Sequence, residues 1–339
     1  MYRVEDYAFN CQDKFDRRQI TAGDGFVFST IAYAELDTYG IPFPSPLIDF
    51  STHLGCRPIL LVCAGSERFS DVVVLTQKTV FSENPHCQFS GTAFRVEDKL
   101  FVSYRGTDDS VAGWLEDFEL ISDPCVPSQK YAVEFLNEVA GKYDGDIYLS
   151  GHSKGGNCAV YAAAFCNEEV RKRIKKVYCF DGPGVLPEAR NTAEYQETLP
   201  KIEKYVPQMS FFGMFLNWTD PVIPTRCHGF WFLQHDHYAW YIDKDGNMAN
   251  GKKLSWVAKK TRTVFHRIIS SMSKAERKTF AKIAEDALVY AEVTSMYAMS
   301  FRSIVRLIKY LLTLKNKDEK KFGRWLLREL VLCTLSPAK

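Results

Sequence analysis

The sequence predicts an α/β fold with a mainly parallel central sheet, followed by a helical extension. Short apolar, strand-like segments alternate with helical ones over the first part of the chain, a pattern typical of a parallel sheet covered on both faces. A Gly-x-Ser-x-Gly pentapeptide at 151–155 joins a strand-like run to a helix-like run. Strand patterns cease beyond about residue 255. We therefore expect an α/β domain over 1–255 and a helical extension over 256–339.

Hydrophobic periodicity places the individual elements. In the α/β domain we expect helices near 26–36, 128–142 and 156–165, and strands at 93–96, 100–104, 147–150, 177–180, 209–216 and 230–233. In the extension we expect helices over 273–299 and 301–314.

Composition indicates a soluble globular protein. The 339 residues are 46% hydrophobic, enough for one α/β domain with a substantial core. The N-terminus lacks a secretory signal pattern, and no apolar run approaches the roughly 18 residues of a membrane span, so we expect a cytoplasmic location. The 10 cysteines form no C-x-x-C pair or metal-like spacing, which predicts reduced, mostly buried thiols and no metal site.

Charge is distributed unevenly. Residues 252–339 hold 20 Lys and Arg against 7 Asp and Glu, a net charge of +13, whereas the whole chain carries +2. Within 301–314, the basic residues Arg302, Arg306 and Lys309 recur at helical spacing beside an apolar stripe. Such a helix either packs on the α/β domain or makes peripheral contact with an anionic membrane. No nucleic-acid-binding motif accompanies the basic residues, so we expect no nucleic acid partner.

Ser153 is the candidate nucleophile. Residues 146–150 form a strand-like run and 156–164 an alanine-rich, helix-like run, so Ser153 would lie on a sharp turn between strand and helix. Gly151 and Gly155 allow the close backbone approach that such a turn requires. This context is that of a nucleophile elbow.

A serine nucleophile needs a base, and His235 is our candidate. It follows the apolar run 230–233, near the last expected strand, where the chain order serine, acid, histidine would place it. His228 precedes that run, and His237 lies two residues further along the loop.

Two aspartates compete for the acid that orients the base. Asp220 is preferred because it follows the expected strand 209–216 and precedes His235 by 15 residues. Asp181 is the alternative, although the Gly-Pro-Gly turn that follows it suggests a structural role.

An oxyanion hole needs two hydrogen-bond donors. The backbone N–H of Lys154, directly after the nucleophile, is the first candidate. Thr107 is the second, because it follows an earlier strand and offers both its N–H and its hydroxyl. A pair between Arg105 and Asp117 is expected to hold this loop.

Together these motifs resemble the class 3 lipase branch of the α/β-hydrolases, and more closely a bacterial, functionally unassigned offshoot of those lipases. The resemblance spans about residues 20–245. It is carried by the motifs at 88–89, 104–109 with Trp114 and Asp117, 151–157, 181–184, 220–224 and 234–236. It implies an α/β-hydrolase domain with Ser153 as nucleophile, His235 as base, and Thr107 with Lys154 in the oxyanion hole. Lysine stands where the lipases commonly carry leucine after the serine, which predicts a more polar rim, and no amphipathic lid is evident after Trp114.

The sequence therefore predicts a serine hydrolase that cleaves a carboxylic ester through an acyl-enzyme, without metal or organic cofactor. A lipid or other acyl ester is the expected substrate, with the apolar residues of 211–218 and 230–240 lining an acyl pocket. A thioesterase or amidase using the same triad, or a non-catalytic membrane-associated scaffold, are the alternatives. The oligomeric state is left open.

Overall fold

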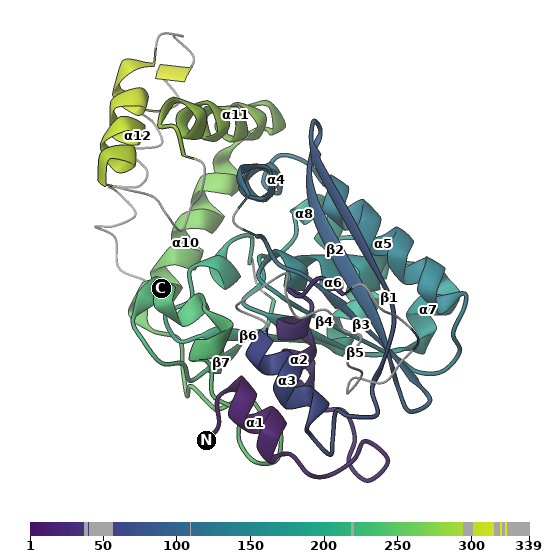
Figure 1. The fold of residues 1–339 in the computed structure, drawn as a ribbon. Coiled ribbons are helices and arrows are strands. Elements are labelled where there is room, and N and C mark those ends of the chain that lie inside the picture. The colour runs from purple at the N-terminus through teal and green to yellow at the C-terminus, as the bar shows by residue number, and fades with distance from the viewer. Residues whose placement is uncertain are drawn as a thin grey trace.

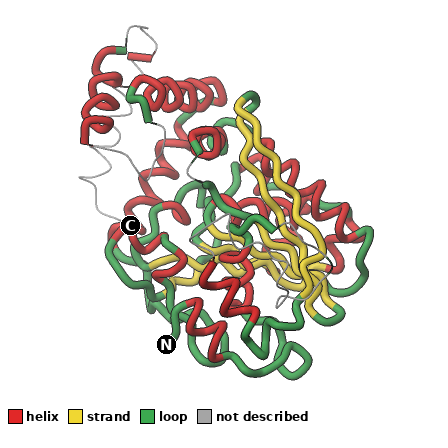
Figure 2. The backbone as a smooth tube through the Cα atoms, viewed as in Figure 1, coloured by secondary structure: helices red, strands yellow, loops and turns green. Residues whose placement is uncertain are grey.

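The computed structural model describes residues 1–36, 40, 57–108, 110–217, 220–293, 301–314, 319, 320 and 323. A single seven-stranded sheet forms the centre of the molecule, with helices on both sides (Figures 1 and 2). The strands follow one another in chain order: β1 (Val73–Glu83), β2 (His86–Val96), β3 (Lys99–Tyr104), β4 (Ile147–His152), β5 (Ile174–Phe180), β6 (Ile202–Pro207) and β7 (Ile223–Thr225).

The sheet is mostly parallel. The strand pairs from β3 to β7 are parallel, whereas β1, β2 and β3 form an antiparallel meander at one edge. Parallel strands require crossover connections, and their carboxyl ends meet at one edge of the sheet. The turns after β3, β4 and β5 therefore lie close together.

The helices are distributed over the following segments: α1 (Val4–Asn10), α2 (Ala22–Ile31), α3 (Arg57–Ala64), α4 (Val111–Glu119), α5 (Pro127–Ala140), α6 (Lys154–Phe165), α7 (Glu168–Arg173), α8 (Pro187–Arg190), α9 (Ala193–Thr198), α10 (Trp256–Ser271), α11 (Lys274–Tyr290) and α12 (Phe301–Thr313). Four short 3-10 helices are also described: η1 (Leu199–Lys201), η2 (Phe212–Met214), η3 (Trp231–His235) and η4 (His237–Ala239).

Two hydrophobic cores lie on opposite faces of the sheet. On β3, Phe101 packs into the core under α1, α2 and α3, whereas its neighbour Val102 packs into the core under α5 and α6. On β5, Tyr178 and Cys179 divide in the same way. This alternation follows from the period of two along a strand, and it explains why these strands are apolar throughout.

The C-terminal helices pack against one end of the α/β domain, beside α4 (Figure 1). Leu115 of α4 packs with Leu288, which lies on α11, and with Leu307 of α12. His86 Nδ1 lies 2.8 Å from Glu119 Oε1, and its Nε2 lies 3.9 Å from Glu285 of α11. This end of the domain is therefore joined to the extension by apolar and polar contacts.

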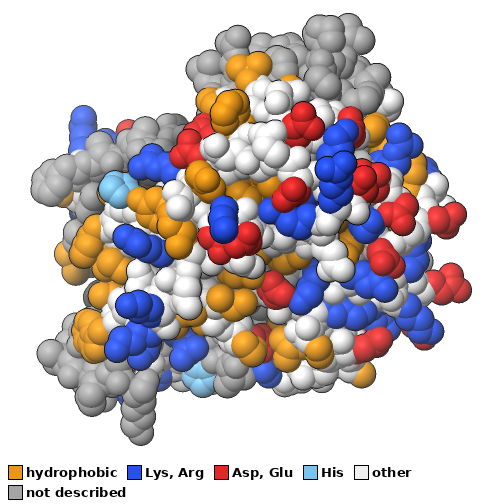
Figure 3. All heavy atoms as spheres, turned by 90° about the horizontal axis from the view of Figure 1, so that it is seen from below, with side chains coloured by type: hydrophobic (Ala, Val, Ile, Leu, Met, Phe, Trp, Pro, Cys, Tyr) orange, Lys and Arg blue, Asp and Glu red, His pale blue; other side chains and the backbone are white. Residues whose placement is uncertain are grey.

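The surface charges are unevenly arranged. At the left of Figure 3, on the side of α10 and β7 in Figure 1, Lys and Arg side chains stand beside hydrophobic ones. Most Asp and Glu side chains of that view lie further to the right. None of the helices in the described part of the chain is long and apolar enough to cross a membrane.

The predicted α/β fold with a mainly parallel central sheet is confirmed, and two strand predictions are wrong. Residues 209–216 contain η2, and residues 230–233 fall in and before η3. The second segment is apolar but not buried, since Phe230 and Leu233 are each 69% exposed. The sequence reading also missed β1, β6 and β7. The expected helix over 273–299 ends at Tyr290, and residues 294–300 lie outside the described residues.

Candidate active site

Ser153 lies on a sharp turn between β4 and α6. Its backbone has φ 56° and ψ −131°, a conformation that non-glycine residues rarely adopt. A Cβ added to Gly151 would lie 2.1 Å from the carbonyl oxygen of Gly155, and one added to Gly155 would lie 2.1 Å from that of Tyr104. The turn therefore tolerates only glycine at these positions, as a nucleophile elbow requires.

His235 lies against Ser153. Its Nε2 is 3.1 Å from Ser153 Oγ, and its Nδ1 is 2.7 Å from Asp181 Oδ2. An ionised carboxylate only accepts hydrogen bonds, so Nδ1 carries the proton and Nε2 is free to accept from the serine hydroxyl. This is the order of contacts that activates a serine nucleophile.

Asp181 is positioned by the strand next to the nucleophile strand. It directly follows β5, which pairs with β4, and the Ser153 N–H donates to the carbonyl of Phe180 at 2.9 Å. The Asp181 side chain is 1% exposed, and its Oδ1 accepts from the Ser210 hydroxyl at 2.5 Å and the Gly213 N–H at 3.0 Å. The carboxylate is thus held by the loop around η2, which the sequence had suggested to be a strand.

The expectation that Asp220 orients His235 is corrected by this geometry. Asp220 Oδ1 accepts from Arg190 Nε at 2.8 Å, and its Oδ2 accepts from the Tyr195 hydroxyl at 2.9 Å. Both carboxylate oxygens of Asp220 thus accept hydrogen bonds from residues of α8 and α9. Asp220 therefore joins two helices to the loop before β7, and Asp181 occupies the place that the sequence reading gave to Asp220.

The imidazole of His235 is supported on two sides. The Phe212 ring lies 4.2 Å from it between centroids, and the His152 ring lies 4.6 Å from it. His152 Nε2 lies 2.8 Å from the carbonyl oxygen of His235, and its Nδ1 lies 3.0 Å from the Tyr33 hydroxyl. Burial holds the pKa of His152 well below its usual range, so a neutral ring donates to the His235 carbonyl and accepts from Tyr33.

The other candidate bases do not contact Ser153 in this way. The His237 ring lies tilted against Tyr33 and edge-on to His152, and burial lowers its pKa to about 4. His228 is exposed at the surface. Of the three histidines weighed from the sequence, the structure brings only His235 to the serine.

Thr107 lies on the loop after β3, and Lys154 begins α6 directly after Ser153. A Cβ added to Gly106 would lie 2.6 Å from the carbonyl oxygen of His152, which shows how closely the loop after β3 approaches the elbow. The Thr107 hydroxyl donates to Asp117 Oδ2 at 2.5 Å. Arg105 lies instead 3.7 Å from Glu35, so the expected pair between Arg105 and Asp117 is replaced by the Thr107–Asp117 bond.

Asp117 is an unusual carboxyl. Burial raises its pKa to about 6, against the lowering effects of the Lys154 ammonium and of the Thr107 hydrogen bond. Its Oδ1 is buried and has no hydrogen-bond partner within the described part of the chain.

The side chain of Lys154 is buried, so the prediction of a more polar rim is wrong. It is 1% exposed, and its Nζ donates to Glu116 Oε2 at 2.8 Å. Glu116 lies 38 residues earlier in the chain, and sequence spacing offers no signal for this pair.

The surface that precedes His235 is apolar. Phe230 and Leu233 are each 69% exposed, and Trp231 is 42% exposed. Phe212, which lies against the His235 ring, also lies near Trp114, with 6.1 Å between ring centroids. Trp218, which the sequence placed in an acyl pocket, lies outside the described residues.

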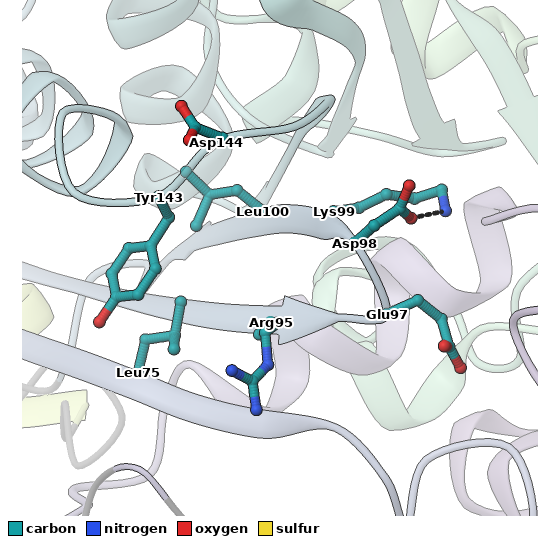
Figure 4. Close-up of a pocket in the computed structure, with 8 residues that line it drawn as sticks. All are labelled: Leu75, Arg95, Glu97, Asp98, Lys99, Leu100, Tyr143 and Asp144. Atoms are coloured by element: carbon teal, nitrogen blue, oxygen red, sulfur yellow. Dashed lines mark hydrogen bonds and ion pairs between the residues drawn. The ribbon is translucent and has the colours of Figure 1, made fainter.

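A separate hollow of about 150 Å³ lies at the β2–β3 turn (Figure 4). Arg95, Asp98, Lys99 and Tyr143 are among the residues that line it, and Asp98 pairs with Lys99 there at 2.5 Å. Ser153, His235 and Asp181 are not among the residues that line it. Within the described residues, no group of three or more His, Cys, Asp or Glu side chains is arranged to hold a metal ion.

Comparison with known proteins assigns the chain to a family. No curated protein matches the sequence. Among solved structures, M37 lipase is similar over 57% of this chain and 69% of its own, with 14% identity and a TM-score of 0.39. The Rhizomucor miehei lipase–propeptide complex is similar over 65% of this chain and 67% of its own, with 12% identity and a TM-score of 0.37. A family model described as Mbeg1-like matches residues 63–286, well over half of the 339-residue chain. The protein therefore belongs to the Mbeg1-like family.

Proposed function

We propose that this protein is a serine hydrolase that cleaves a carboxylic ester of a lipid or other acyl substrate. The observation that carries the proposal is the continuous contact from Ser153 Oγ through His235 to Asp181, at 3.1 and 2.7 Å. In this mechanism His235 accepts the serine proton as Oγ attacks the ester carbonyl, and then donates it to the leaving alcohol. Water, activated by the same histidine, releases the acid from the acyl-enzyme.

The negative charge that develops on the carbonyl oxygen needs fixed donors. The backbone N–H of Lys154 is suited to this, because it begins α6 directly after the nucleophile and a helix N-terminus favours negative charge. The backbone N–H of Thr107 is the second proposed donor. The Thr107 hydroxyl is bonded to Asp117, so the role we assign to that hydroxyl bond is to fix the loop.

An acyl substrate is favoured by the apolar surroundings of His235. Phe212 packs on the imidazole, and exposed Phe230 and Leu233 stand just before it in the chain. Apolar walls with a few polar groups are typical of sites that bind small apolar ligands. Ester, thioester and amide substrates with matched acyl chains would separate the proposed esterase from a thioesterase or amidase.

Ser153→Ala tests the proposal. The parent should react with a fluorophosphonate probe and hydrolyse short-chain esters, and the variant should lose both, with activity falling by about 10⁴-fold or more. A melting curve should show that the variant is folded. A parent that neither reacts with the probe nor cleaves any acyl ester would favour a non-catalytic scaffold, and full activity in folded Ser153→Ala would rule out the serine mechanism.

A further inference from the structure

Two consecutive carboxylates of α4 hold the two residues that we assign to the oxyanion hole. Glu116 binds the Lys154 ammonium at 2.8 Å, and Asp117 binds the Thr107 hydroxyl at 2.5 Å. Lys154 begins α6, whereas Thr107 lies on the loop after β3. One turn of α4 is therefore bonded to both sides of the proposed site.

Glu116 is anchored on several elements. Its side chain is fully buried, and its Oε1 accepts from the Ser128 N–H of α5 at 2.7 Å. Its Oε2 accepts from the Gln88 N–H of β2 at 2.9 Å as well as from Lys154. The carboxylate thus accepts three hydrogen bonds, one each from α5, β2 and α6. A neutral Gln at this position would place its NH₂ group against one of these donors, so a carboxylate is the side chain that satisfies all three.

We propose that the Glu116–Lys154 ion pair is a positioning element that sets the separation of the oxyanion-hole donors. This inference rests on the proposed function. The backbone N–H of Lys154 belongs to the residue whose side chain is tied to α4, and α4 also holds the Thr107 loop through Asp117. A shift of α4 relative to α6 would therefore displace one donor from the other, and misplacement by about 1 Å can cost a factor of roughly 100 in rate.

The charges around Asp117 also support a positioning role for the Glu116–Lys154 ion pair. The groups that act on Asp117 are the Lys154 ammonium of α6, the Thr107 hydroxyl, the neighbouring Glu116 carboxylate and His235 of η3. Among these, the strongest lowering of the Asp117 pKa comes from Lys154, which opposes the effect of burial. Removing the ammonium should raise the Asp117 pKa further. The Asp117 carboxyl, which accepts from the Thr107 hydroxyl, would then stay protonated up to a higher pH than in the parent.

The first experiment compares Lys154→Met with the parent. Methionine is of similar length, removes the charge and keeps the backbone N–H. We expect kcat to fall by about 10- to 100-fold with little change in KM, since the affected interaction forms in the transition state. We also expect the acidic limb of the kcat profile to move to higher pH. Lys154→Arg, which keeps a cation, should recover part of the lost kcat if the larger head fits.

Arg68→Met is the matched control. Arg68 and Asp24 form a second fully buried ion pair, with 2.7 Å between Nη2 and Oδ2, under the helices on the other face of the sheet. Its loss should lower stability without changing kcat or the pH profile of the folded protein. If Lys154→Met does not fold, the double variant Glu116→Gln/Lys154→Met, which removes both charges, takes its place. It should fold with reduced stability, because the amide NH₂ faces a backbone N–H, while kcat stays low.

The outcomes separate the two proposals. If the parent is not labelled by a fluorophosphonate and hydrolyses nothing, the proposed function fails. If the parent is labelled and active, but folded Lys154→Met or the double variant keeps the parent kcat and pH profile, the ion pair is only structural and the positioning proposal is overturned.

Discussion

Asp181 and His235 are 54 residues apart in the chain, yet Asp181 Oδ2 lies 2.7 Å from His235 Nδ1. The contact exists because Asp181 directly follows β5, which pairs with the strand that leads to Ser153, and because the loop around η2 supplies donors to its other oxygen. Asp220, by contrast, is bonded to Arg190 and Tyr195. The two aspartates therefore lead to opposite expectations for function and stability.

We expect Asp181→Asn to lower kcat by up to about 10⁴-fold, because the amide no longer fixes the productive tautomer of His235 or stabilises its charged form. Asp220→Asn should leave kcat nearly unchanged and lower the free energy of unfolding by about 1–3 kcal/mol, because Arg190 loses a charged partner. Steady-state kinetics and urea unfolding of both variants check this. A large loss of kcat in Asp220→Asn with little effect in Asp181→Asn would reverse the assignment.

The sequence was sufficient for the parts of the site that are local. The turn at Ser153 is formed by residues that are consecutive in the chain, so the turn and the strand and helix around it could be predicted. Asp181, the aspartate that contacts His235, was only the alternative to Asp220, because the choice depends on which strands are neighbours, and β6 was missed. Its residues 202–207 include charged side chains that pack against neighbouring strands, as with Lys176 and Glu203, which form an ion pair.

The hydrophobic pattern of the sequence also did not predict which side chains are exposed to solvent. The segment 230–233 is apolar enough for a buried strand, yet its Phe230, Trp231 and Leu233 side chains are exposed, whereas Lys154 is charged but buried. Each outcome depends on distant partners: the sheet ends at β7, and the lysine meets Glu116 of α4. Local composition cannot determine either.

The raised pKa of Asp117 predicts a pH-dependent contribution to stability. Its carboxyl has a pKa of about 6 in the folded protein against the ordinary value of 3.8, so the folded state binds this proton more tightly than the unfolded chain. The ionised carboxyl therefore costs stability above about pH 6, and the cost disappears as the pH falls towards about 4.

Relative to Asp117→Asn, the parent should thus gain about 1–3 kcal/mol of stability between about pH 6 and pH 4. Urea unfolding of both proteins across this range measures the difference, and the comparison cancels the titration of other groups. A stability difference that stays constant over the range would show that Asp117 has no raised pKa.

The buried pair of Arg68 and Asp24 predicts a large structural effect without a functional one. Arg68 Nε also donates to Asp24 Oδ1 at 2.8 Å, and its Nη1 donates to the Asp13 carbonyl at 2.6 Å. Asp24→Asn leaves a buried guanidinium without a charged partner, which should cost about 3–5 kcal/mol. Fluorophosphonate labelling below the melting temperature should be retained. A loss of less than about 1 kcal/mol would contradict this account.

The last prediction concerns the basic helix α12. Arg302 and Lys309 are exposed, whereas Arg306 is paired with Glu292 and is 29% exposed. If α12 makes peripheral contact with an anionic membrane, Arg302 and Lys309 should each contribute on the order of 1 kcal/mol to binding. Changing both to Gln should weaken sedimentation with anionic vesicles, and changing Arg306 should have less effect because its charge is already compensated.

Two controls distinguish electrostatic binding through α12 from non-specific binding to vesicles: the salt concentration and a variant with other lysines changed. Exposed charges are screened over about 10 Å at 0.1 M ionic strength, so binding should fall as salt rises. Three other lysines are exposed: Lys130 on α5, Lys142 on the turn after α5 and Lys172 on α7. Changing all three to Gln should leave vesicle binding intact. Hydrolysis of a soluble short-chain ester should be unaffected by either set. A parent protein that stays in the supernatant at both low and high salt would exclude membrane contact and leave α12 with its packing role, in which Leu307 contacts the apolar cluster of α4 and α11.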